Sequence, residues 1–339
     1  MLIQDAFNSN AFAEVELTAA INKQPFVPRK LGSMGLFEEK GVSVLTIAVE
    51  ESDGTLSLIP NTARGAPSNQ NLHSKRKLRP LNIPHFPLDE TIMAEEIQGI
   101  RAFGSSELQV VERVRDDRLR EMRAKHDATL EYGRIGAVKG IIYDSNGSTV
   151  IYNLFTEFGE TQDSVDFVLG TATTDIKGKC VSVSRLVETE LGADMYDHIH
   201  VFCGDEWFDK FVRHTEVKAA YERWAANGSA GGQGQFLRED NRRGFPFAGM
   251  IFENYRGSVG GVDFVADAEA HFFPVGVPGL FITRFGPADF METVNTLGLP
   301  MYAKAEMKRF DRGIDIHTQS NPISICTRPK VLVKGTTSN

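Results

Sequence analysis

Alternating apolar and polar positions predict two β-hairpins along this chain. Residues 42–50, VSVLTIAVE, alternate and are rich in β-branched side chains; ESDG then supplies a turn signal and TLSLIP follows, so a hairpin is expected over 42–60. A second hairpin is expected over 138–159, where Asn146-Gly147 is the strongest short turn signal. The tail from Glu306 onward alternates again, which predicts long strands.

Helical spacing of apolar residues extends furthest over residues 107–132. Ser106, with Gln109 three residues later, makes a capping box at the start, and Gly133 is a natural stop at the end. These signals predict a helix of about residues 106–131, which is roughly 40 Å long at 1.5 Å per residue. A helix of this length with a thin apolar stripe suits an elongated protein better than a spherical one.

Shorter helices and strands alternate over residues 165–300. In chain order, the predicted elements are a helix at 175–192, a buried-type strand at 198–204, a helix at 205–224, and strands at 246–254 and 261–266. This alternation predicts a compact α/β unit. Together with the hairpins and the long helix, it predicts an α+β fold class for the whole chain.

Two stretches lack the periodicity that would let them fold alone. Residues 1–40 carry one predicted short helix at 10–22 and are then interrupted by prolines and glycines. Residues 61–88 show no periodicity, with four prolines and a local charge of +5. Because compact domains rarely keep structureless loops beyond about 15 residues, we expect this stretch to be functional or disordered. We interpret 42–88 as one protruding loop that contains a hairpin.

Five basic side chains give this loop its charge. They are Arg64, Lys75, Arg76, Lys77 and Arg79. Such a cluster can contact nucleic acid, dock on an acidic surface of another subunit, or simply be solvated. Its place in a protruding loop favours docking, so these five residues are the candidate inter-subunit contacts.

Composition excludes several classes of protein. The 339 residues are 41% hydrophobic and 24% charged, which excludes wholesale disorder. No apolar run approaches the ~20 residues of a membrane span, and no secretory signal is expected. Three scattered cysteines, Cys180, Cys203 and Cys326, predict no disulfide framework and a reducing cytoplasm as the place of synthesis. A net charge of −8 at pH 7 argues against a dedicated nucleic-acid binder.

Candidate chemical sites are weak. His198 and His200 share one face of a predicted strand, but Cys203 points to the other face and no fourth metal ligand follows nearby. A second group matches no metal-binding spacing; its members are Asp263, Asp267, Glu269 and His271. The glycine-rich stretch 228–234 lacks the GK[ST] ending of a phosphate-binding loop. We therefore predict no catalytic, metal or cofactor site and no enzyme activity.

The order of these elements resembles the major capsid proteins of tailed phages with the Hong Kong 97 fold. More specifically, the chain is similar to the lambda-type E family. The segments that carry the resemblance are INKQPFVPRKLGSMGLFEEKGVSVLTIAVEESDGTLSLIPNTARG, EIQGIRAFG, TLEYGRIGAVKGIIYDSNGSTV and SNPISICTRPKVLV. None of these segments is a catalytic signature, and their order along most of the chain is what makes the resemblance specific.

The resemblance implies an assignment for each part of the chain. Residues 1–40 become the N-arm and residues 41–88 the extended E-loop. The P-domain, which contains the spine helix, takes residues 89–164 and 301–339. The A-domain takes residues 165–300, and its loops lie at the centre of each capsomer.

The resemblance also implies a function in assembly. Many copies are expected to form pentamers and hexamers that close into an icosahedral shell around double-stranded DNA, without sequence-specific binding to it. The implied partners are other copies, a scaffold, a head protease, a portal and decoration proteins, with synthesis in the bacterial host cytoplasm and a final place in the virion. No membrane is involved. Because lambda-type relatives rely on non-covalent contacts, no cross-link through Lys75 or Lys77 is expected.

Two other functions stay open at the level of sequence. An encapsulin-like compartment would share the fold but store a protein cargo instead of DNA. A cytoplasmic enzyme would use the α/β unit, with Asp263, Asp267 and His271 as site residues. Size separates the enzyme from the shell protein, because an enzyme is expected as a small oligomer and a shell protein as capsomers or megadalton particles.

Overall fold

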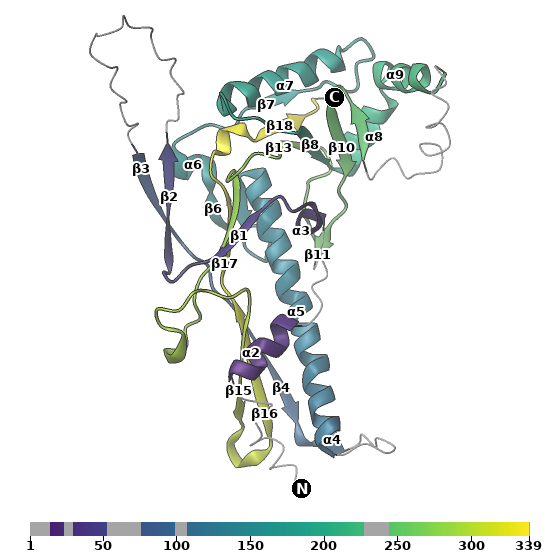
Figure 1. The fold of residues 1–339 in the computed structure, drawn as a ribbon. Coiled ribbons are helices and arrows are strands. Elements are labelled where there is room, and N and C mark those ends of the chain that lie inside the picture. The colour runs from purple at the N-terminus through teal and green to yellow at the C-terminus, as the bar shows by residue number, and fades with distance from the viewer. Residues whose placement is uncertain are drawn as a thin grey trace, which may run out of the picture. The chain divides into compact units, whose positions relative to one another are not determined.

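The computed structural model describes residues 14–23, 30–52, 76–98, 107–226, 244–259 and 261–338 (Figure 1). The chain divides into two compact units. The first unit consists of Met1–Ile47, Pro80–Arg134 and Ile282–Ser324, and the second consists of Ala48–Arg79, Ile135–Phe281 and Ile325–Asn339. Each unit therefore draws on segments that are far apart in the sequence.

A three-stranded antiparallel sheet forms the centre of the first unit. Its strand order is β15 (Tyr302–Met307), β16 (Gly313–Ser320) and β4 (Phe86–Met93). Apolar and polar side chains alternate along β16, as the sequence predicts for this part of the tail, so that Ile314 and Ile316 are buried while Asp315 is exposed. The buried side chains of the sheet face the helices of the unit.

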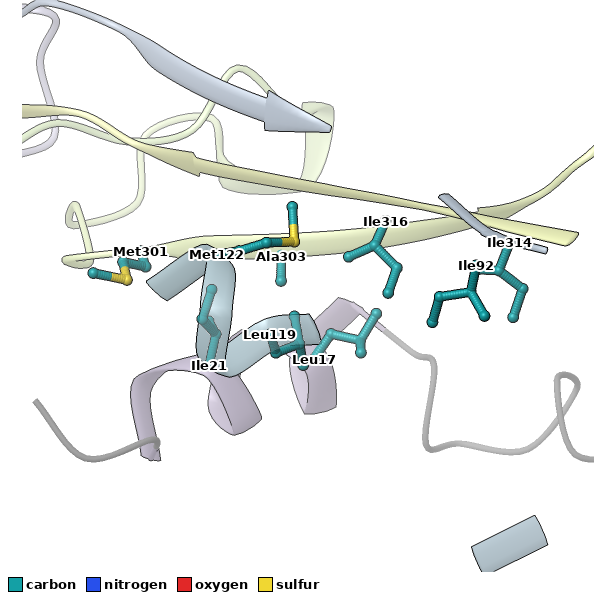
Figure 2. Close-up of a cluster of buried hydrophobic side chains, with 9 residues drawn as sticks. All are labelled: Leu17, Ile21, Ile92, Leu119, Met122, Met301, Ala303, Ile314 and Ile316. Carbon is teal, nitrogen blue, oxygen red and sulfur yellow. The ribbon is translucent and has the colours of Figure 1, made fainter. Parts of the chain in front are cut away.

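Two helices cover this sheet and close the core of the first unit. Helix α2 (Glu14–Lys23) contributes Leu17 and Ile21, and Figure 2 shows both packed with residues of α5 (Glu107–Lys139) and the strands. The other members of this cluster are Ile92, Leu119, Met122, Met301, Ala303, Ile314 and Ile316. The Thr18 hydroxyl donates a 3.2 Å hydrogen bond to the Ala303 carbonyl, which fixes α2 against β15. The predicted short helix at 10–22 is thus present as α2 in the described residues.

Helix α5 (Glu107–Lys139) is longer than the sequence predicts. The expected end of the helix at Gly133 is wrong. A glycine ends a helix only where the backbone leaves the helical conformation, and at Gly133 it does not. The helix ends before Gly140, whose φ of +81° is the left-handed conformation that favours glycine. Gly136 lies inside the last turns, where an added Cβ would be 2.9 Å from the Ile142 Cα. Gly136 is therefore explained by close packing against Ile142 and not by the end of the helix.

The expectation that residues 61–88 lack regular structure is wrong for their last part. Strand β3 (Arg76–Asn82) pairs with β2 (Thr46–Ser52), and β4 begins at Phe86. Pro87 is tolerated in β4 because that strand lies at the edge of its described sheet, where a missing N–H breaks no ladder. The return strand expected at 55–60 lies outside the described residues.

A further three-stranded sheet is built from distant segments. Its order is β1 (Glu38–Gly41), β14 (Phe281–Phe285) and β17 (Pro322–Cys326), with β1 parallel to β14. Helix α3 (Lys30–Met34) precedes β1, and the buried Glu131 carboxylate accepts a 2.8 Å hydrogen bond from the Leu31 backbone N–H. Helix α4 (Ala94–Gln98) follows β4 directly.

The second unit contains a six-stranded mixed sheet. Its strand order is β7 (Ser164–Asp166), β18 (Val333–Thr336), β13 (Ala270–Val275), β8 (His198–Cys203), β10 (Met250–Asn254) and β9 (Phe245–Phe247). The buried strand predicted at 198–204 is confirmed as β8 and has partners on both sides. Because β18 pairs with β13 and β7, this sheet also uses a segment beyond residues 165–300.

Aromatic side chains form the core between this sheet and its helices. The Trp207 ring lies 5.2 Å from the ring centroid of Phe211 and 5.3 Å from that of Phe167. Helix α7 (Ile176–Leu191) matches its prediction, and its first turn is capped by the Asp175 side chain, which accepts a 2.7 Å bond from the Gly178 N–H. The helix predicted at 205–224 is divided at His214 into α8 (Asp205–Arg213) and α9 (Thr215–Ala226).

The second predicted hairpin is shorter than expected. Strands β5 (Ile141–Tyr143) and β6 (Val150–Asn153) pair around the Asn146-Gly147 turn, but helix α6 (Leu154–Phe158) replaces the end of the predicted strand. The Asn153 side chain caps α6 by accepting a 3.1 Å bond from the Phe155 N–H. The remaining short elements are β11 (Ser258–Val259), β12 (Val262–Asp263), η3 (Met291–Thr293), η4 (Arg309–Asp311) and η5 (Pro329–Val331). Within the described ranges, no helix combines the length and apolar character needed to cross a bilayer.

Candidate assembly surfaces

Arg79, one of the five candidate contact residues, binds its own chain in the second unit. Its guanidinium donates a 2.8 Å hydrogen bond to the Phe158 carbonyl and a second bond to the Glu157 carbonyl. The guanidinium carbon lies 5.3 Å from the centroid of the Phe158 ring. The carbonyls at a helix C-terminus carry partial negative charge, so α6 is a favourable partner for this cation. Arg79 therefore joins the β2–β3 pair to α6.

The structure describes less of the other four candidate contact residues. Arg76 and Lys77 belong to β3, but only their backbone is described, and Arg64 and Lys75 lie outside the described residues. Their role as inter-subunit contacts stays a prediction. Strand β3 nevertheless shows that the backbone of the last part of this basic segment has regular structure.

The first unit exposes a run of large apolar side chains before β15. We call residues 287–299 the apolar loop. Met291 is 88% exposed, Leu297 70% and Val294 59%, and Leu299 is exposed as well. Several large apolar side chains exposed within one short loop are typical of interaction sites on soluble proteins. Sequence reasoning missed this loop because its apolar residues follow neither a helical nor a strand period.

Hydrogen bonds hold the apolar loop in a defined shape. The Thr293 hydroxyl lies 2.9 Å from the Ala288 carbonyl, and the Thr296 hydroxyl donates to the Thr293 carbonyl at 2.8 Å. The Leu299 N–H donates to the Tyr302 phenol oxygen at 2.9 Å. Exposure of the apolar side chains is therefore built into the loop, and an interface formed there would need little further ordering.

A second exposed surface lies at the turn between β15 and β16. We call residues 308–312, KRFDR, the arginine tip. Phe310 is 73% exposed and has a φ of 67°, which is unusual for a bulky residue. The Arg309 and Arg312 guanidinium carbons lie 5.0 and 5.7 Å from the centre of its ring. The sequence signal was an aromatic residue at a position where a hairpin turn is usually polar.

His200 of the predicted strand is a buried, hydrogen-bonded group. His200 is buried and its Nε2 lies 3.0 Å from a carboxylate oxygen of the buried Glu253 on the neighbouring strand. Cys203 is also buried, and burial raises the pKa of its thiol well above the usual range. The arrangement is one of paired, buried groups, as the hydrogen-bonded alternative to a metal site requires.

The second candidate group, Asp263, Asp267, Glu269 and His271, does not gather at one point in the described residues. The carboxylate of Glu269 lies 3.5 Å from His271 Nε2 and 2.6 Å from Lys334 Nζ, and these two groups lower the pKa of Glu269 to about 2. Burial lowers the pKa of His271. Asp263 and Asp267 are exposed. In the part of the chain that the structure describes, no three His, Cys, Asp or Glu side chains gather as a metal site. The glycine-rich stretch 228–234 lies outside that part.

Comparison with known proteins accounts for a chain that exposes apolar surface. The family model described as phage major capsid protein E matches residues 14–337. The chain belongs to this family. It is 31% identical over 347 residues to the major capsid protein of Pseudomonas phage KPP10, with 96% of this chain and 97% of the relative covered. It is 27% identical to the major capsid protein of Salmonella phage Felix O1, with 95% of each chain covered.

Solved structures support the expected fold. The chain is similar to a capsid protein of a prophage from E. coli CFT073, with a TM-score of 0.54 at 12% sequence identity, covering 96% of this chain and 99% of that one. At this identity the likeness concerns the fold alone. The prediction of an α+β fold of the Hong Kong 97 type, and of the E family within it, is confirmed.

Membership of the phage major capsid protein E family makes this chain a structural protein of a virion shell. The two alternatives left open by the sequence, a cargo compartment and a cytoplasmic enzyme, are not favoured by these relatives. The surfaces described above are therefore candidate contacts between copies of a capsid protein.

Proposed function

We propose that copies of this chain assemble into pentamers and hexamers that close as an icosahedral shell around double-stranded DNA. The observation that carries this proposal is the match of the capsid protein E family over residues 14–337, in which both the described units take part. The proposed role is purely structural, without enzyme activity. The chain is made in the bacterial host cytoplasm and ends in the virion.

The physical character of the chain supports shell formation. The apolar loop keeps Met291 and Leu297 largely exposed, and an obligate interface would remove them from water. The net charge of −8 also fits a wall that encloses DNA without gripping it, because tight phosphate binding would oppose packing and release. Recognition of a DNA sequence has no part in this role.

The proposal extends to the parts of the chain and to their partners. Residues 1–40 act as an N-arm, 41–88 as an E-loop, 89–164 with 301–339 as a P-domain, and 165–300 as an A-domain. A scaffold, a head protease, a portal and decoration proteins are the proposed partners besides other copies. The basic residues of the E-loop dock on a neighbouring subunit, with Arg64, Lys75, Arg76 and Lys77 as the contacts. Arg79 instead supports the loop from within its own chain.

Expression of the full chain tests assembly directly. Size-exclusion chromatography with light scattering and electron microscopy is expected to show capsomers and closed megadalton particles. A well-folded monomer or small oligomer at high concentration would contradict the proposal. For DNA enclosure, particles purified from lysed host cells should protect double-stranded DNA from nuclease; shells that hold a protein cargo and no DNA would overturn that part.

A further inference from the structure

The apolar loop and the arginine tip lie at opposite ends of β15 in the first unit (Figure 1). The loop, residues 287–299, precedes the strand, and the tip, residues 308–312, follows it. Six residues of β-strand span about 20 Å. Glu292 of the loop reaches Lys304, the third residue of the strand, whereas the tip begins after the sixth, so we expect the tip and the loop of one chain to remain apart.

The arginine tip has the composition of a docking element. Its five residues include three basic and one acidic side chain. Arg309 and Arg312 are exposed, and no described side chain lies within ion-pair distance of either guanidinium. Phe310 is held outward in a left-handed backbone conformation between these two cations. Strained backbone positions are common at functional sites, and an exposed aromatic ring is typical of an interaction surface.

The apolar loop is complementary to this tip in both respects. It offers exposed Met291, Val294 and Leu297 as apolar surface. Its charged residues are Asp289 and Glu292, whose side chains are 65% and 59% exposed, and it contains no basic residue. Glu292 accepts bonds of 3.0 and 3.2 Å from Lys304, and Asp289 accepts a 2.8 Å bond from Gln319, yet both side chains stay more than half exposed, so a second cation can approach them. A surface that joins apolar area to acidic groups fits an aromatic ring between two arginines.

We propose that the arginine tip of one copy docks on the apolar loop of a second copy of this chain. Phe310 packs against Met291 and Leu297 of the neighbour. The Arg309 and Arg312 guanidiniums face the carboxylates of the neighbour's loop. This inference rests on the proposed shell assembly and names the surfaces that one of its contacts uses.

The two surfaces differ, so the contact is heterologous. Each copy gives its tip to one neighbour and receives the tip of another on its loop. Contacts of this type close into a ring when the rotation between copies allows it. A ring of such contacts would join capsid subunits without any requirement for a two-fold axis between them.

Engineered cysteines test the contact directly. In the double variant F310C with M291C, oxidation of assembled particles with copper–phenanthroline should link copies into a ladder of covalent oligomers on a denaturing gel. A disulfide within one chain would leave the band at the mass of a monomer, so only links between copies give the ladder. The three native cysteines are free and buried, so they do not compete.

The matched control uses Met195, which is 85% exposed, close to the 88% of Met291. F310C with M195C, and each single variant, should give no ladder. If particles of F310C with M291C form normally but no ladder appears, or if the control pair gives the same ladder, the proposed contact is overturned. Failure of the unaltered chain to form any particle would instead contradict the proposed function.

Charge reversal provides a second test. R309E with R312E should lower the yield of particles by roughly tenfold or more, since it places like charges across the contact. Adding D289K and E292K to the same chain should restore much of the yield, because complementarity is re-established with the signs exchanged. Full assembly of R309E with R312E would overturn the proposal. Circular dichroism of each variant would show whether a loss of yield reflects a loss of folding, and a folded double variant that the added lysines do not rescue would also overturn it.

Discussion

His126 on α5 lies 3.0 Å, through its Nε2, from the Thr318 hydroxyl on β16, in the interior of the first unit. Burial, with a smaller contribution from the nearby His317, lowers the pKa of His126 to about 4. The folded chain therefore keeps this ring neutral at pH values where the unfolded chain protonates it. A buried neutral histidine between a long helix and a sheet makes the unit sensitive to acid.

We expect the free energy of unfolding to fall as the pH is lowered from about 6.5 towards 4. Between these values the unfolded chain binds the proton and the folded chain does not, so acid favours unfolding by up to about 3 kcal/mol. Urea denaturation of unassembled subunits at several pH values measures this dependence. In H126Q, which keeps a polar group toward Thr318, the dependence should be weaker by that amount. The exposed His85 supplies a control, because H85Q should keep the full dependence; equal slopes in all three proteins would contradict the assignment.

Two glycines of the α5 region should respond in opposite ways to alanine. G140A should destabilise the second unit by about 2–4 kcal/mol, because φ is +81° and the new Cβ would lie 2.2 Å from the Phe155 ring. G133A should stabilise the chain by about 0.5–1 kcal/mol, because that residue is helical and an added Cβ meets nothing within 4 Å. Thermal or urea unfolding of both variants gives the comparison. Similar effects at the two positions would show that the helix does not end where the structure places its end.

Removal of Arg79 should loosen the β2–β3 pair. R79A deletes the bonds to the Glu157 and Phe158 carbonyls, and backbone amides of β3 are expected to exchange with deuterium about tenfold faster, while global stability changes little. R213A is the control, since the Arg213 side chain is 81% exposed and pairs with Asp209 one turn away in its helix. Unchanged exchange in β3 of R79A would show that the contact with α6 does not hold the strand pair.

Reversal of the four remaining basic residues should block assembly without unfolding the subunit. R64E, K75E, R76E and K77E together are expected to leave a folded subunit that forms no particles, because the loop would repel the acidic neighbour it is proposed to contact. Electron microscopy and circular dichroism measure the two properties. The charge-matched control reverses four basic side chains that are more than half exposed elsewhere: Arg120, Lys125, Arg213 and Arg256. Normal particles from the first variant, or an equal loss in the control, would remove the docking proposal.

Elements with local signals were predictable from the sequence. Helix α7 carries its own cap at Asp175 and a helical stripe of buried residues, and strand β8 is a short apolar run, so neither depends on knowing a distant partner. Family membership was predictable from longer segments whose order, not whose chemistry, is characteristic. The end of α5 was not predictable, because the sequence does not distinguish Gly133, which is helical, from Gly140, which has a positive φ.

The assembly surfaces were largely hidden from sequence reasoning. Arg79 was a candidate by its charge, but its partners are backbone carbonyls at Glu157 and Phe158, which carry no residue-type signal. Strand β4 owes its existence to β16, more than two hundred residues later in the chain, so Pro87 read as a loop residue. The apolar loop is recognisable only once the structure shows Met291 and Leu297 largely exposed among the described residues of their unit.

The position of β18 between β7 and β13 has a consequence for biosynthesis. During translation, β7, β8, β10 and β13 emerge first, and the place between β7 and β13 stays empty until residues 333–336 have left the ribosome. A nascent chain therefore carries an unfinished sheet with two unpaired strand edges. The second unit is therefore completed only after residues 333–336 have left the ribosome, and the sheet is ready for contacts with other copies only from that point on.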